Sequence, residues 1–109
     1  MAYDEELAER VRDALALREG VTERKMFGGI AFMLAGNMAC GVLGDDLIVR
    51  VGSEEHERAL AEPHVRPFDF TGRPSKGIVF VSPAGVASDE TLAGWVGAGA
   101  DFAASLPSK

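Results

Sequence analysis

The sequence contains a single cysteine, Cys40, so no internal disulfide can form. Such sparse cysteine fits a reducing compartment. No apolar run approaches the roughly 20 residues that a membrane-spanning helix needs. The first ten residues are acidic and helical in pattern, whereas a signal peptide begins with basic residues. These absences predict a cytoplasmic protein without a membrane segment.

Basic residues are also in the minority. Eleven lysines and arginines stand against 17 aspartates and glutamates, which gives a net charge of −6. The phosphate backbone of nucleic acids repels an acidic domain unless its positive charges cluster. Direct DNA binding is therefore disfavoured unless a local basic patch forms.

Residues of the kind that bind metals are few and scattered. His56 and His64 lie eight residues apart, and no second ligand set of cysteine, histidine or carboxylate stands near either at metal-binding spacing. Both are expected to be surface histidines. No metal ion and no cofactor is expected.

Catalytic patterns are equally scarce. Cys40 lies in an apolar segment between Ala39 and Gly41, which indicates a buried and unreactive thiol. The acidic pair Asp45-Asp46 is explained by a turn, and the pair Glu54-Glu55 by the start of a helix. The residues therefore do not favour an enzyme.

The residues that are present predict one folded domain, residues 1–109, with one sheet at its centre. Apolar residues make up 47 % of the 109 residues, as in an ordinary globular domain. Segment 24–51 contains three short apolar runs separated by two turn signals, residues 35–37 and 44–46. This spacing predicts three antiparallel strands joined by hairpins, with Met38–Leu43 in a central, covered position.

Two further strands are expected at Pro67–Phe70 and Ile78–Val81, joined by a long loop with basic residues. Asp4, Ser53 and Ser88 are expected to cap three helices. The second of these helices is expected to span Glu54–Ala61. The last carries one long apolar stripe, formed by Leu92, Trp95, Val96, Gly99, Phe102, Ala103 and Leu106.

The order α-β-β-β-α-β-β-α predicts an α+β fold: a two-layer sandwich with one five-stranded antiparallel sheet. Two positions in the strands leave alternatives open. The pair Gly28-Gly29 indicates either a bulge that turns Phe27 into the core or bare backbone under a ligand. Arg50 on a strand face is either solvated or paired, or it contacts a ligand or partner.

Short motifs in this order resemble the N-terminal domain family of TfoX, also called Sxy, which are bacterial regulators of competence for DNA uptake. The resemblance covers nearly the whole chain. Its motifs are Lys25-Met26-Phe27-Gly28-Gly29, Phe32, Gly36, Leu47-Ile48-Val49-Arg50, Pro67-Phe68, Lys76-Gly77, Pro83 and Leu92-Ala93-Gly94-Trp95-Val96. The members of this pattern that are expected to have structural roles are Met26, Phe27, Gly28, Gly29, Phe32, Gly77 and Trp95.

The resemblance implies a fold like that of secretion chaperones, with helices packed on one antiparallel sheet. Full-length competence regulators also have a C-terminal helical domain of the DNA-associated type, and we expect this chain to be a stand-alone copy of the N-terminal module. Some similar stand-alone proteins carry an RNA methyltransferase label. Such an enzyme typically needs a glycine-rich turn after a parallel strand, and the sequence predicts no parallel strand.

Three functional hypotheses follow, in decreasing order of support. The first is a regulatory module that binds an unknown protein partner or forms a homodimer. The second is a protein that binds a small anion, a nucleotide or RNA. It requires the basic side chains to converge, whereas a solvated loop with scattered charges is the simpler interpretation. The third is an enzyme. The basic side chains of the second hypothesis are Arg24, Lys25, Arg50, Arg73 and Lys76.

Overall fold

The computed structural model describes residues 3–26, 28–69, 72 and 75–107 and has an α+β fold. Its helices are α1 (Glu5–Ala14), α2 (His56–Leu60) and α3 (Asp89–Ala104), with a 3₁₀ turn at Pro83–Val86. Its strands are β1 (Val21–Met26), β2 (Gly29–Leu34), β3 (Asn37–Leu43), β4 (Asp46–Arg50), β5 (Val65–Pro67) and β6 (Ile78–Val81).

The six strands form one antiparallel sheet in the order β1-β2-β3-β4-β6-β5. The predicted hairpins of the central segment are confirmed, and β3 lies inside the sheet as expected. The prediction of five strands misses β1, which pairs along its whole length with β2. The sequence of β1 hides the strand because five of its six residues are exposed.

The predicted bulge at Gly28-Gly29 is wrong. Met26 pairs directly with Gly29, so the β1–β2 pairing continues to this point without a bulge, and Gly28 lies in the turn. Gly28 has φ +80°, a conformation that glycine adopts without strain. Phe27, which the bulge was expected to turn inward, lies outside the described residues. The irregularity in the β2–β3 pairing falls instead between Phe32 and Met33.

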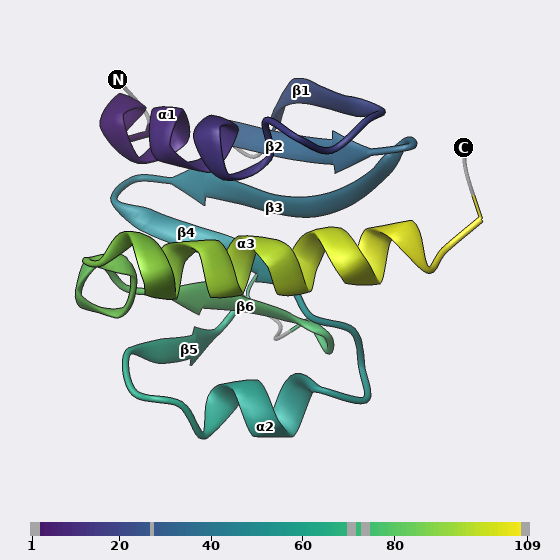
Figure 1. Cartoon of the computed structure of the whole chain (residues 1–109). Coiled ribbons are helices and arrows are strands. Elements are labelled where there is room, and N and C mark those ends of the chain that lie inside the picture. Colours follow the sequence, from purple (N-terminus) through teal and green to yellow (C-terminus); the bar gives the residue numbers. More distant parts are fainter. Residues whose placement is uncertain (1–2, 27, 70–71, 73–74, 108–109) are drawn as a thin grey trace.

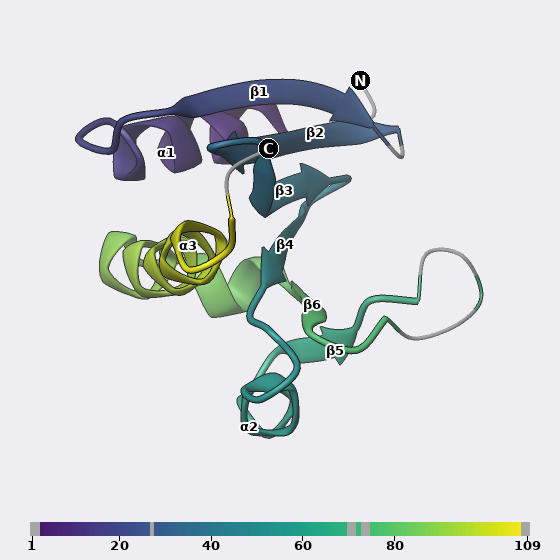
Figure 2. The same cartoon turned by 90° about the vertical axis from the view of Figure 1, so that its right-hand side faces the viewer.

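Helices α1 and α3 pack on one face of the curved sheet, and α2 closes the end beside β5 and β6 (Figures 1 and 2). The main core lies between these layers. Leu92 and Val96 of α3 are buried there, and Trp95 packs against it half-buried, so the predicted apolar stripe is confirmed. Gly99 lets α3 approach β3, because a Cβ atom at this position would collide with the carbonyl oxygen of Ala39.

A second, smaller apolar cluster lies apart from this core. Ile48 and Phe80 bury their side chains there with Phe68, whose ring centroid lies 4.9 Å from that of Phe80. Phe68 follows β5 instead of lying in it. The predicted strand Pro67–Phe70 is therefore displaced, because the chain pairs with β6 over Val65–Pro67. Phe70 lies outside the described part of the chain.

Two of the three predicted helix caps are confirmed. The Asp4 carboxylate accepts hydrogen bonds from the backbone N–H groups of Glu6 (2.9 Å) and Leu7 (3.1 Å). The Ser88 hydroxyl accepts one from the N–H of Thr91 (3.1 Å). The cap at Ser53 is wrong, because α2 begins later, after Glu55, which makes no side-chain cap.

The expectation of two surface histidines is half wrong. His64 is exposed, but His56 is only 7 % exposed. The Nδ1 atom of His56 accepts a hydrogen bond of 2.9 Å from the backbone N–H of Gly77. A histidine at the start of α2 thus holds the segment that leads into β6.

Candidate functional site

The basic residues singled out in the sequence occupy different parts of the fold. Arg24 and Lys25 are consecutive, exposed residues of the edge strand β1. Their side chains point to opposite faces of the sheet because successive strand residues alternate. Arg50 ends β4, and exposed Lys76 precedes β6. Arg73 lies outside the described residues.

The sheet separates the described members of this set. Strands β1 and β4 are three positions apart, which corresponds to about 14 Å at the usual strand spacing. The guanidinium carbon of Arg50 lies 5.3 Å from the ring centroid of Phe102, an aromatic partner within the fold. The structure therefore does not bring Arg24, Lys25 and Arg50 together around one anion.

The positions of three motif residues, Phe32, Gly29 and Gly77, explain their side chain or its absence. Phe32 is buried in the core. A Cβ atom at Gly29 would collide with the carbonyl oxygen of Val42, and Gly77 has φ +94° close to the backbone of Gly52. Met26 is 38 % exposed at the end of β1.

A groove between α2 and α3 encloses a cavity of about 400 Å³, within the size range of small-molecule and side-chain binding pockets. Trp95 is the only tryptophan of the chain and forms part of its wall. We call this the α2–α3 groove. The residues that line it are Val51, Glu55, Arg58, Ala59, Glu62, Thr91, Gly94, Trp95 and Ala98.

One wall of the α2–α3 groove is a helical stripe on α3, and the other is formed by residues within α2 and on either side of it. On α3 the stripe begins at Thr91 and continues through Gly94 and Trp95 to Ala98, at positions i, i+3, i+4 and i+7. The wall on the α2 side has the same spacing from Glu55 to Glu62. This repeated spacing is the signal in the sequence that could have indicated the groove. This spacing indicates a groove only when the fold is known to place α2 beside α3.

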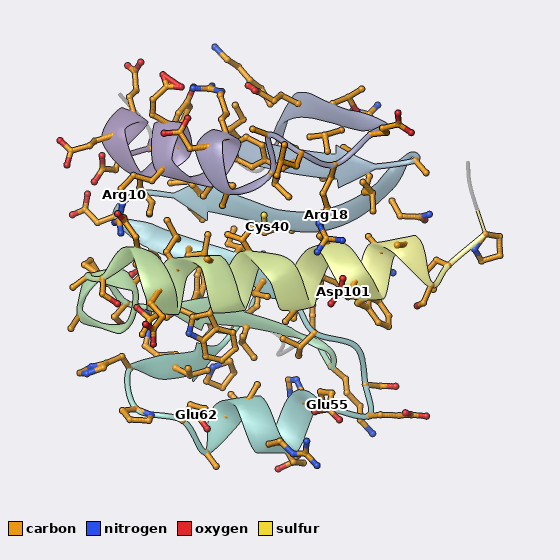
Figure 3. The ribbon with its side chains drawn as sticks, viewed as in Figure 1. Arg10, Arg18, Cys40, Glu55, Glu62 and Asp101 are labelled. Carbon is orange, nitrogen blue, oxygen red and sulfur yellow. The ribbon has the colours of Figure 1, made fainter. Side chains whose placement is uncertain are left out.

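The two sides of α3 differ in how they are closed. On the α1 side, Arg10 pairs with Asp89 (3.1 Å) and Arg18 pairs with Asp101 (3.0 Å), so ion pairs bridge that side (Figure 3). A depression of about 270 Å³ there contains the Arg10–Asp89 pair in its lining. Across the α2–α3 groove, no ion pair joins residues that the structure describes. The groove is thus the side of α3 left open.

Acidic residues outnumber basic ones in the lining of the groove, which holds Glu55, Glu62 and one arginine, Arg58. Segment 53–62 contains four glutamates and one arginine, and α3 contains three acidic residues and no basic one. Two of the three acidic residues of α3, Asp89 and Asp101, pair with Arg10 and Arg18 on the α1 side, so the acidic side chains that line the groove come from the α2 side. Glu55 and Glu62 stand at the two ends of α2 (Figure 3). The groove has an apolar floor and an acidic rim.

The structure gives no support for thiol chemistry, a metal site or a membrane-spanning helix among the described residues. Burial raises the pKa of the Cys40 thiol to about 12, so this residue is a protonated core side chain at neutral pH. Within the described ranges, no group of three histidine, cysteine or acidic side chains could hold a metal ion. Among the described helices, none is long and apolar enough to cross a bilayer.

Helices packed on one face of a single antiparallel sheet, with an open groove beside the central helix, define a small α+β domain. The model of the TfoX N-terminal domain matches residues 13–103, and the chain therefore belongs to the TfoX N-terminal domain family. The match includes all six strands, α2 and nearly all of α3. Comparison with curated proteins and with solved structures finds no significant match.

Proposed function

We propose that this chain is a non-enzymatic regulatory module of the cytoplasm that binds a protein partner through the α2–α3 groove. The family relationship supports a regulatory or interaction role. The groove supplies a surface for it, whereas the sheet separates Arg24 and Lys25 on β1 from Arg50 on β4.

The observation that carries this proposal is Trp95 in the wall of an open cavity. Trp95 is half-buried in the free chain, and tryptophans that a partner buries fully often contribute a large share of the binding energy of an interface. The neighbouring wall residues Gly94 and Ala98 are small, so the indole remains accessible from the groove. A partner side chain can enter the cavity without a rearrangement of α3.

The edge strand β1 is a weaker candidate for the interaction surface. It presents Glu23, Arg24 and Lys25 in succession, and charged side chains discourage pairing of an edge strand with another chain. A homodimer that joins two α2–α3 grooves would bring like charges together, because a two-fold contact uses the same surface twice. The proposed partner is therefore a different protein, and homodimerisation would need another surface.

Two glycines of α3 provide a matched test. A Cβ atom at Gly94 or at Gly97 would meet no other atom within 4 Å, but only Gly94 lines the groove. The Gly94→Leu variant should place a side chain in the cavity beside Trp95 and obstruct it, while Gly97→Leu adds the same side chain elsewhere on the same helix. The partner recovered from the native host by the unmodified chain should be lost with Gly94→Leu and kept with Gly97→Leu. Equal recovery by both variants would refute the proposed surface.

A further inference from the structure

We infer that the α2–α3 groove receives a basic amphipathic segment of the partner, with lysine or arginine side chains between Glu55 and Glu62 and apolar side chains on Trp95. This inference rests on the proposed function and specifies the chemistry of the partner. It is carried by the charge and the lining of the groove.

The electrostatic part of the inference comes from the distribution of charge. Segment 53–62, which forms the α2 side of the groove, contains four glutamates and one arginine, and two of the glutamates, Glu55 and Glu62, line the groove, so this side favours positive charge. A positively charged segment is attracted to such a surface, and an acidic segment of equal hydrophobicity is repelled. The groove therefore selects the sign of its ligand.

Both carboxylates on the rim are available to a new cation. Within the described part of the chain, Glu62 makes no ion pair. Glu55 pairs only with Arg58, one turn further along (3.1 Å), and both side chains are largely exposed, at 51 % and 79 %. Such a surface pair contributes little stability, so Arg58 can turn into solvent when a ligand cation arrives.

The floor of the groove requires the ligand to be apolar as well as charged. Val51 and Ala59 are buried, and Trp95 offers part of its indole to the cavity. Lysine and arginine pack their aliphatic stems on such surfaces while the charged ends stay near water. A cation near the indole face gains a further attraction. A purely polar cation would use the rim and leave the floor wet.

Trp95 makes the test direct, because it is the only tryptophan of the chain and its fluorescence reports on the groove. The probes are a short amphipathic peptide of lysine and leucine and its counterpart with glutamate in place of lysine. At low salt the Lys/Leu peptide should change the emission of Trp95 in a saturable manner, and the Glu/Leu peptide should not. Added salt should weaken the binding of the Lys/Leu peptide.

Three variants separate the contribution of the acidic rim to peptide binding from that of the cavity. Glu62→Gln should weaken binding of the Lys/Leu peptide several-fold, and Gly94→Leu should abolish it. Gly97→Leu should bind like the unmodified chain. Loss of the signal with Gly97→Leu as well would overturn the inference, as would full retention with Gly94→Leu, which would mean that the peptide binds elsewhere by charge alone.

Failure of this inference is distinguishable from failure of the proposed function. If neither peptide binds, or if both bind equally, the basic ligand is wrong. The proposed function survives that result provided that the native partner still depends on Gly94. If partner recovery is insensitive to Gly94→Leu, the groove itself is not the interaction surface.

Discussion

Gly99 of α3 lies directly against Ala39 of β3, so that the helix backbone and the strand backbone are in contact where a side chain would otherwise stand. A Cβ atom at Gly99 would collide with the Ala39 carbonyl oxygen. Gly94 and Gly97 of the same helix face open space. All three glycines of α3 disfavour the helix equally. Only Gly99 offsets this cost, because it allows α3 to pack closely on β3.

Substituting alanine for these glycines should give opposite signs. Gly99→Ala should lower the free energy of unfolding by about 1–3 kcal/mol, because the added methyl group forces α3 away from the sheet. Gly94→Ala and Gly97→Ala should each raise it by roughly 0.5–1 kcal/mol through helix propensity. Urea denaturation measures all three. A stabilising Gly99→Ala change would contradict the close approach of α3 to β3.

The contact between His56 and Gly77 predicts a local effect. In His56→Leu the N–H of Gly77 loses its acceptor, which should cost about 1–3 kcal/mol of unfolding free energy. Hydrogen exchange should show the amide of Gly77 losing protection relative to that of Val79 in β6. An unchanged exchange rate at Gly77 would mean that the hydrogen bond does not hold this segment in solution.

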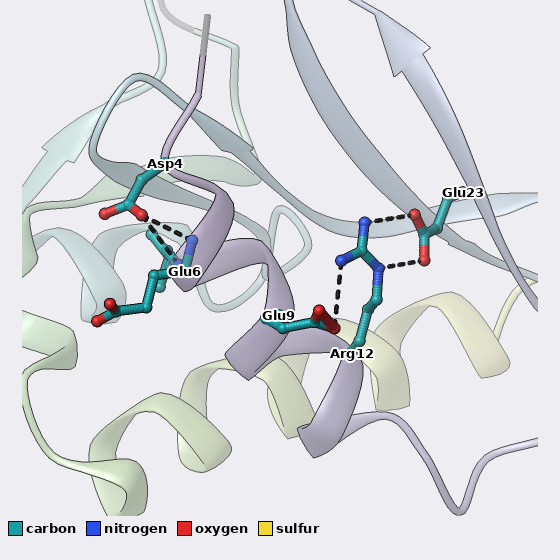
Figure 4. Close-up of polar contacts among 6 residues, drawn as sticks. Asp4, Glu6, Glu9, Arg12 and Glu23 are labelled. Carbon is teal, nitrogen blue, oxygen red and sulfur yellow. Dashed lines mark hydrogen bonds and ion pairs between the residues drawn. The ribbon is translucent and has the colours of Figure 1, made fainter. Parts of the chain in front are cut away.

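The Arg12–Glu23 ion pair predicts a dependence on pH. Arg12 donates to Glu23 through Nε (2.6 Å) and Nη2 (2.9 Å), and also contacts Glu9 (Figure 4). The hydrogen bonds from Arg12 lower the pKa of Glu23 below its ordinary value of 4.5. A lowered folded-state pKa stabilises the fold above the unfolded-state pKa, and this contribution disappears as the pH falls through the folded-state value.

Glu23→Gln should therefore lower the free energy of unfolding at neutral pH and leave it unchanged in strong acid. The effect should stay below about 1 kcal/mol, because the side chains of Arg12 and Glu23 are 36 % and 39 % exposed and water screens the pair. Urea denaturation of both proteins across the acid range measures the difference. A difference that grows towards low pH would contradict the role assigned to the pair.

Burial of Cys40 predicts an unreactive thiol. With its pKa raised to about 12, almost none of the thiol is ionised at pH 8, and the surrounding core excludes reagents. Iodoacetamide should modify the folded protein very slowly and the urea-unfolded protein fully, as measured by mass spectrometry. Rapid alkylation of the folded protein would show that β3 opens readily.

Local sequence signals predicted the parts of the fold that depend on neighbouring residues. The caps at Asp4 and Ser88, the central hairpins and the stripe on α3 all follow from spacing within one element. The sequence does not predict strand β1, because its residues are exposed and partly charged and form a strand only by pairing with β2. The sequence does not predict the burial of His56, because its hydrogen-bond partner, Gly77, lies 21 residues away in the sequence.

The candidate site was harder to predict than the fold for the same physical reason. Arg24, Lys25 and Arg50 could be identified as unexplained charges, but their separation depends on how many strands lie between them. The α2–α3 groove depends on two helices that are far apart in the sequence. The sequence predicts Trp95 as an apolar residue of the last helix, but its place in the wall of the groove depends on the position of α2.

Nuclear magnetic resonance mapping of the bound Lys/Leu peptide tests the central claim most directly. Titration of the isotope-labelled chain should shift the Trp95 indole N–H and the amides of Glu55 and Ala98, which line opposite walls of the groove. The amides of Arg24 and Lys25 in β1 should remain unchanged. Shifts confined to β1, with the signals of the α2–α3 groove unaffected, would contradict the account.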